Sequence, residues 1–173
     1  MIVLNIPHVL VALTAIGGCA HDLHDRRIPN YLTFGSGLLA FCYGWATGGW
    51  SGLGVAVAGW GLAVGIFIPF FLLRGMGGGD VKLMGALGAW IGPASLLSLT
   101  FYTAIAGGVM ALIVVLWQRK VATTAANIWL LLCHWRAAGV RPLPALSLEN
   151  HNSARLAYGI PIAVGAMVTI WLH

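Results

Sequence analysis

The chain has 173 residues, of which 60% are hydrophobic and only 8% are charged, whereas ordinary soluble domains carry about 25% charged residues. This composition excludes an ordinary soluble globule, and the length fits a single integral membrane domain over residues 1–173. The net charge of +5 suits anionic lipid headgroups better than nucleic acid in so apolar a chain. The three cysteines contain no CxxC pair, so neither a zinc ribbon nor a disulfide framework is predicted.

Long uncharged blocks in the first part of the chain predict three membrane crossings. A bilayer core roughly 30 Å thick needs about 20 helical residues. The block 1–21 fits one crossing, and because no Lys or Arg precedes it, we expect a retained membrane helix and not a cleaved signal peptide. The block 28–73 has 46 residues and fits two crossings, with a glycine-rich turn expected at 47–52.

The second part of the chain predicts three further crossings. The block 83–118 has 36 residues and fits two, with a turn expected either at Gly92-Pro93 or at 98–103. The block 156–173 has 18 residues and just fits one more. The sequence therefore predicts an all-α polytopic membrane protein with about six transmembrane helices.

The cations predict the orientation of these crossings. All nine Lys and Arg residues fall in three connections, at 26–27, at 74–82 and at 119–155, which share one side when the segments alternate. The positive-inside rule makes that side cytoplasmic and puts the N-terminus and the C-terminus outside. Within the basic connection 119–155, the apolar stretch 121–135 reaches only about 22 Å as a helix, so we expect it to lie on the membrane surface. If it crossed instead, the last segment would reverse its direction.

Glycine is frequent inside the expected crossings. It accounts for 24 of the 173 residues. Small residues let transmembrane helices approach one another, so close helix contacts are predicted at these positions. The glycines in question are Gly59, Gly61, Gly65, Gly85, Gly88, Gly107 and Gly108.

Two of the expected cytoplasmic loops carry acidic residues. Asp22 and Asp25 follow the first segment, and Asp80 precedes the fourth. The alternation of the predicted segments across the bilayer is enough to place Asp22 or Asp25 at the same membrane depth as Asp80, on separate helices. Such a pair of carboxylates is what aspartyl proteolysis requires, since one takes a proton from water while the other, protonated, polarises the scissile carbonyl. The residue pattern leaves both Asp22 and Asp25 as candidates, although Asp25 also has Arg26 or Arg27 as a simple pairing partner.

The residues around these acids have expected supporting roles. The second loop contains three consecutive glycines, Gly77, Gly78 and Gly79. Glycine leaves space for the backbone of another chain, so we expect a substrate peptide to use this loop. Pro29 favours an extended end to the first loop, and Asn30 is expected to cap the following helix. Lys82 is expected to anchor its helix at the headgroups.

Other uses of these acids have to be weighed. His21 and His24 form an HDxHD cluster with the two aspartates of the first loop, a donor set that Zn or Mn accepts, but no HExxH motif is present. We therefore expect loop histidines and no metal. A small proton-coupled transporter or channel with Asp80 on its pathway is the alternative function, although a transporter favours acids near the bilayer midplane. A non-catalytic membrane assembly subunit is a further alternative.

Taken together, these motifs resemble a known family. Asp22 followed by Arg26-Arg27-Ile28-Pro29-Asn30, with Gly77-Gly78-Gly79-Asp80-Val81-Lys82-Leu83 and the late Ala157-Tyr158-Gly159-Ile160-Pro161-Ile162-Ala163, resembles the bacterial type IV prepilin peptidases. These are membrane aspartyl proteases of the GxGD type, and the likeness is to the short form that serves tight-adherence (Flp-type) pili.

The resemblance implies a function and a site. It implies that Asp22 and Asp80 are the catalytic pair and that Asp25 is a loop residue. It implies cleavage of the basic leader from prepilins or pseudopilins at the cytoplasmic face of the bacterial inner membrane, with no cofactor. Longer members also carry a cysteine-rich zinc module between the first two segments and methylate the new N-terminus; only about ten residues separate those segments here, so N-methyltransferase activity is not expected.

Overall fold

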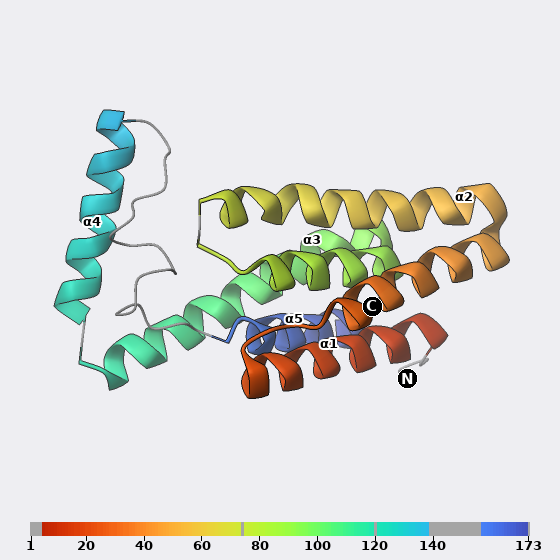
Figure 1. Cartoon of the computed structure of the whole chain (residues 1–173), viewed down its shortest axis with the longest axis horizontal. Helices are drawn as coiled ribbons and strands as arrows, with labels where there is room; N and C mark the ends of the chain where they lie inside the picture. Colours follow the sequence, from red (N-terminus) through yellow and green to blue (C-terminus); the bar gives the residue numbers. More distant parts are fainter. Residues whose placement is uncertain (1–4, 74, 120, 139–156, 173) are drawn as a thin grey trace.

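The computed structural model describes residues 5–73, 75–119, 121–138 and 157–172, and these residues form five α-helices and no strand (Figure 1). The helices are α1 (Ile6–Asp25), α2 (Asn30–Leu72), α3 (Gly78–Trp117), α4 (Val121–Ala138) and α5 (Gly159–Leu172). Three of them, α1, α2 and α3, are long and apolar enough to cross a membrane, judged by length and composition. The predicted all-α fold class is confirmed.

Helix α2 reverses its direction at Gly49 (Figure 1). The backbone of Gly49 has φ 59° and ψ −142°, a conformation that residues with a Cβ rarely adopt. The two arms of α2 then lie so close that a Cβ at Gly52 would overlap with the carbonyl oxygen of Gly44. The turn predicted at 47–52 is therefore confirmed.

Helix α3 folds back at Gly92, which has φ 72° and ψ 174° and is followed by Pro93. Proline has no backbone N–H and cannot continue the hydrogen-bonding of the preceding arm. Of the two predicted turn positions, Gly92-Pro93 is correct, whereas 98–103 is helical. The described part of the chain thus contains, besides α4, six helical stretches: 6–25, 30–48, 50–72, 78–91, 93–117 and 159–172.

The first arm of α3 forms the centre of the bundle. Every residue from 83 to 90 is buried, and most of them are small or aliphatic. At Gly88 a Cβ would lie 2.6 Å from the carbonyl oxygen of Gly59 on α2, so the two backbones touch directly. The predicted close contacts are confirmed at Gly59, Gly85 and Gly88, but the prediction is wrong for Gly61, Gly65 and Gly108, where a Cβ would meet nothing within 4 Å.

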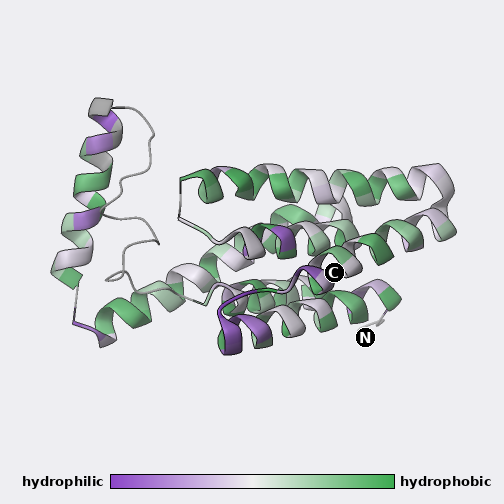
Figure 2. Cartoon of the chain, viewed as in Figure 1, coloured by the Kyte–Doolittle hydropathy of each residue, from purple (hydrophilic) through white to green (hydrophobic). Residues whose placement is uncertain are grey.

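The outside of the bundle is apolar. Large side chains are more than half exposed there, among them Phe34, Leu38, Trp45, Leu97 and Phe101. Figure 2 shows hydrophilic residues gathered at the end of α1, in its connection to α2 and at the start of α3, and mainly hydrophobic residues elsewhere on the bundle. Water would disfavour such a surface, whereas lipid chains cover it without cost. Composition, helix length and exterior together indicate a membrane protein.

Helix α4 stands apart from the other helices and runs across the end of the bundle (Figure 1). Its apolar residues Ile128, Trp129 and Leu130 are all more than half exposed. The prediction of a helix at 121–135 is confirmed, and its relation to the membrane stays a prediction. The rest of the basic connection, residues 139–155, lies outside the described residues.

A buried hydrogen-bond network joins α1, α2 and α3. The Oγ of Ser36 on α2 accepts a hydrogen bond from Trp90 Nε1 on α3 at 2.9 Å and lies 2.7 Å from Thr14 Oγ1 on α1. All three side chains are buried. Interhelical hydrogen bonds in membranes contribute about 0.6 kcal/mol on average, because the helices find other partners when separated. One hydroxyl therefore connects three helices.

We predict that Ser36→Ala lowers the free energy of unfolding in detergent micelles by about 1–2 kcal/mol, because it removes two buried hydrogen bonds. Thr47→Ala is the matched control, since Thr47 is exposed and bonds only to Tyr43 of its own helix. Denaturation with SDS, followed by tryptophan fluorescence, measures both variants. Equal stability of the two variants would show that the network contributes nothing.

Candidate active site

Asp22 and Asp80 are the buried acids of the described residues. Asp22 lies in the last turns of α1 and Asp80 in the first turn of α3, and these two helix ends lie at the same end of the bundle (Figure 1). Their exposed fractions are only 9% and 8%. Helices α1 and α3 pack against each other at these ends. The structure thus brings together the two aspartates that the sequence singled out.

A tight contact between α1 and α3 sets the position of this pair. A Cβ at Gly18 would lie only 2.8 Å from Cδ2 of Leu83, which is fully buried. Gly18 precedes Asp22 by about one helical turn, and Leu83 follows Asp80 by about one turn. The contact therefore lies directly next to the aspartates and holds their helices together.

Asp22 is held from a third helix. Its Oδ2 accepts a hydrogen bond from the backbone N–H of Gly159, the first residue of α5, at 2.8 Å. A Cβ at position 159 would come within 2.9 Å of the Asp22 Cβ and 3.0 Å of the Cys19 Cα, so only glycine fits. The role of Gly159 is not predictable from the sequence, because a backbone donor 137 residues away leaves no signal in side-chain type or spacing.

Asp80 is held within its own loop. Its Oδ2 accepts a hydrogen bond from the backbone N–H of Gly77 at 3.3 Å, at the position that precedes α3. A Cβ at Gly77 would lie 3.0 Å from the same oxygen. This arrangement ties the side chain to the unpaired N–H groups of a helix start. A larger residue at position 77 would therefore have to displace the Asp80 carboxylate oxygen.

The other two glycines of the loop also pack against their own chain. A Cβ at Gly78 would lie 3.2 Å from Phe71 Cε2, and a Cβ at Gly79 would lie 3.2 Å from Ile28 Cβ. The space that was expected to receive a substrate peptide is, at these positions, next to side chains of the protein itself. Contact between substrate and these glycines stays a prediction.

Lys82 joins the start of α3 to the start of α2. Its Nζ donates a hydrogen bond to Asn30 Oδ1 at 3.0 Å and lies 5.3 Å from the centroid of the Phe34 ring. Pro29 occupies the position before α2, and Asn30 is the first helical residue with no capping hydrogen bond from a side chain. The predicted cap at Asn30 is wrong, because its side chain accepts the bond from Lys82 instead.

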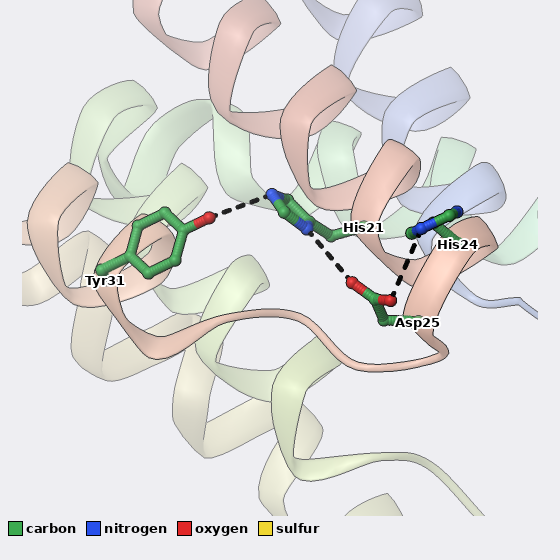
Figure 3. Close-up of polar contacts among 4 residues, drawn as sticks. All are labelled: His21, His24, Asp25 and Tyr31. Atoms are coloured by element: carbon green, nitrogen blue, oxygen red, sulfur yellow. Dashed lines mark hydrogen bonds and ion pairs between the residues drawn. The ribbon is translucent and has the colours of Figure 1, made fainter.

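Asp25 belongs to a separate, exposed cluster. Its side chain is 57% exposed, with His21 Nδ1 at 3.7 Å and His24 Nε2 at 3.9 Å (Figure 3). His21 also shares a hydrogen bond of 3.1 Å with the hydroxyl of Tyr31. Asp25 thus lies beside these two histidines, not in an ion pair with the expected Arg26 or Arg27. Among the described residues, no three His, Cys, Asp or Glu side chains are grouped so that they could hold a metal ion.

The match to a known family covers both aspartates and the glycine loop of this site. Residues 9–112, more than half of the chain, match the sequence profile of the type IV leader peptidase family. No curated protein and no solved structure gives a significant match. The matched range contains both buried aspartates and the glycine loop. The chain therefore belongs to the type IV leader peptidase family.

Proposed function

We propose that the protein is an aspartyl endopeptidase of the bacterial inner membrane, which removes the basic leader from type IV (Flp-like) prepilins or pseudopilins at the cytoplasmic face. The observation that carries this proposal is the pair Asp22 and Asp80, two buried carboxylates at adjoining ends of separate helices, each of which accepts a backbone N–H. Membership of the leader peptidase family supports the substrate class.

The chemistry follows from the pairing of the carboxylates. The ionised carboxylate takes a proton from a water molecule while the water oxygen attacks the scissile carbonyl carbon. The protonated carboxylate donates a hydrogen bond to the carbonyl oxygen, and a proton then goes to the leaving amine as the peptide bond breaks. Two neighbouring buried carboxylates hold one proton between them because a second negative charge is repelled by the first. Asp22 and Asp80 thus supply an acid and a base together.

The six crossings expected from the sequence correspond to the helical stretches that the reversals at Gly49 and Gly92 create, of which 78–91 and 159–172 reach only about 21 Å each and so cross less than the full bilayer core. The cations Arg26, Arg27 and Lys82 lie in the sequence next to the aspartates, at the ends of the same helices. The positive-inside rule then assigns this end of the bundle, and with it the site, to the cytoplasm. Helix α4, which runs across this end, fits a position on the membrane surface.

The geometry favours proteolysis over the alternatives. A proton-coupled transporter needs ionisable groups near the bilayer midplane, whereas Asp22 and Asp80 lie at helix ends. A non-catalytic subunit has no need to bury two acids side by side. Only residues 26–29 separate α1 from α2, so this connection has no room for the cysteine-rich module of longer family members. We therefore propose peptidase activity without N-methyltransferase activity.

We predict that Asp22→Asn and Asp80→Asn each lower the rate of leader removal by about 10³-fold or more, since each removes a group that takes part in the proton transfers. Asp25→Asn is the control and should cleave within about twofold of the unchanged protein, because Asp25 is exposed and lies among histidines. Co-expression with an Flp-type prepilin and mass spectrometry of the pilin N-terminus measures the rate. Processing by either of the first two variants at the normal rate refutes the assignment.

A second prediction concerns Gly77. The substitution Gly77→Val should lower the cleavage rate by about 10- to 100-fold, because the new side chain displaces the Asp80 carboxylate. The backbone at this position, with φ −74° and ψ 145°, tolerates valine, so strain is not the cause. Gly61→Val is the control, since a Cβ there meets no neighbour within 4 Å. If the two variants cleave equally fast, Gly77 does not control the position of Asp80.

The orientation can be tested at Cys133, which is exposed on α4. With the other two cysteines replaced by serine, we expect a membrane-impermeant maleimide to label Cys133 in inside-out vesicles and not in right-side-out vesicles. A lysed sample gives full labelling in both preparations as the control. Labelling from the outer side only would reverse the proposed orientation.

A further inference from the structure

The start of α5 contacts Asp22 directly and is influenced by the charge of Asp80. Gly159 donates its backbone N–H to Asp22, in a buried hydrogen bond of 2.8 Å. The preceding residue, Tyr158, lies near Asp80: burial, and then the negative charge of Asp80, raise the pKa of the Tyr158 phenol. Two consecutive residues of one helix start thus lie next to the two aspartates, which belong to two other helices.

We propose that the start of α5 is a third part of the catalytic site, in which the Gly159 N–H is a positioning group that holds Asp22 as the ionised carboxylate. This inference rests on the proposed function. It assigns Asp22 to accept the proton of the water, which leaves the shared proton on Asp80 to be donated toward the substrate carbonyl oxygen and the leaving amine. Both Tyr158 and Gly159 lie outside the range 9–112 that matches the family profile.

The assignment of roles follows from the hydrogen bonds. An N–H at a helix start stabilises a negative charge, because it carries part of the positive end of the helix dipole and forms a charge-assisted bond. Both aspartates accept such an N–H from a helix start, but the bond from Gly159 to Asp22 measures 2.8 Å, whereas the bond from Gly77 to Asp80 measures 3.3 Å. The shorter bond therefore favours the ionised form at Asp22.

The tight packing around Gly159 limits how its hydrogen bond to Asp22 can be tested. A Cβ at position 159 would press on both the Asp22 side chain and the Cys19 backbone, so any substitution there would disturb packing and hydrogen bond together. A side-chain mutation is therefore a poor test. Replacing the Gly159 amide by an ester removes the N–H and weakens the Tyr158 carbonyl as an acceptor for Ile162, but it adds no side chain and leaves the packing unchanged.

The experiment introduces glycolic acid at position 159 by nonsense suppression in cell-free synthesis with lipid nanodiscs. The matched control is the corresponding hydroxy acid at Ile160, whose N–H bonds to the Ala157 carbonyl at 3.2 Å in the same helix start. The ester at 159 should lower kcat by about 10- to 100-fold with KM within about twofold, as expected for losing a bond to a charged group. The ester at Ile160 should leave kcat within about threefold.

The pH dependence separates positioning from a structural role. Among the described residues, the titratable groups that interact with Asp22 are Asp80 on α3 and Cys19 on α1. Tyr158 interacts with Asp80. The ester at 159 removes a bond to the proton-accepting carboxylate, so we expect the acidic limb of the pH profile of kcat to move upward. The ester at Ile160 should leave the limb in place.

The outcomes distinguish the inference from the function on which it rests. If both esters have the same effect on kcat and neither moves the acidic limb, while the unmodified protein cleaves and Asp22→Asn does not, the inference is refuted and the proposed function stands. If Asp22→Asn cleaves normally, the proposed function fails, and the role given to Gly159 fails with it.

Discussion

The burial of two acidic side chains in an apolar helix bundle is the constraint on which the rest of the structure depends. A carboxylate that leaves water loses its hydration, so it needs hydrogen-bond donors or a shared proton in compensation. Asp22 and Asp80 each accept a backbone N–H, from Gly159 and from Gly77. Both donors belong to helix starts, where N–H groups have no partner inside the helix. The carboxylates and the helix starts therefore satisfy each other.

The course of the chain brings the required helix ends together. The reversal of α2 at Gly49 returns the chain to the end of the bundle where α1 stops, so that α3 begins beside Asp22 (Figure 1). The reversal of α3 at Gly92 turns the chain a second time, and α5 later starts at this same end. The buried first arm of α3 then packs against α1 through Leu83 and Gly18, one turn away from the aspartates. Two glycines with positive φ are thus prerequisites for the site.

Much of this arrangement is predictable from sequence, because the chain has long uncharged segments and very few acidic residues. Uncharged block lengths predicted the apolar helical segments, glycine and proline indicated Gly92 as one of two candidate turns, and only four carboxylates had to be weighed. The contacts of the site were not predictable. The Gly159 donor is a backbone group far along the chain, and the packing of Gly77 against Asp80 depends on geometry that residue type does not encode. Side-chain pairing also misled at Asn30, whose partner Lys82 is distant in sequence.

The most direct test of the account measures whether the two aspartates meet, independently of activity. In a chain without native cysteines, Asp22→Cys and Asp80→Cys are combined, and a short bifunctional thiol reagent is added to native membranes. The account predicts an efficient intramolecular cross-link, seen as linkage of the two peptides by mass spectrometry, and little cross-linking when Asp25→Cys replaces Asp22→Cys. Absence of the first cross-link in folded protein, or equal yields from both pairs, would contradict it.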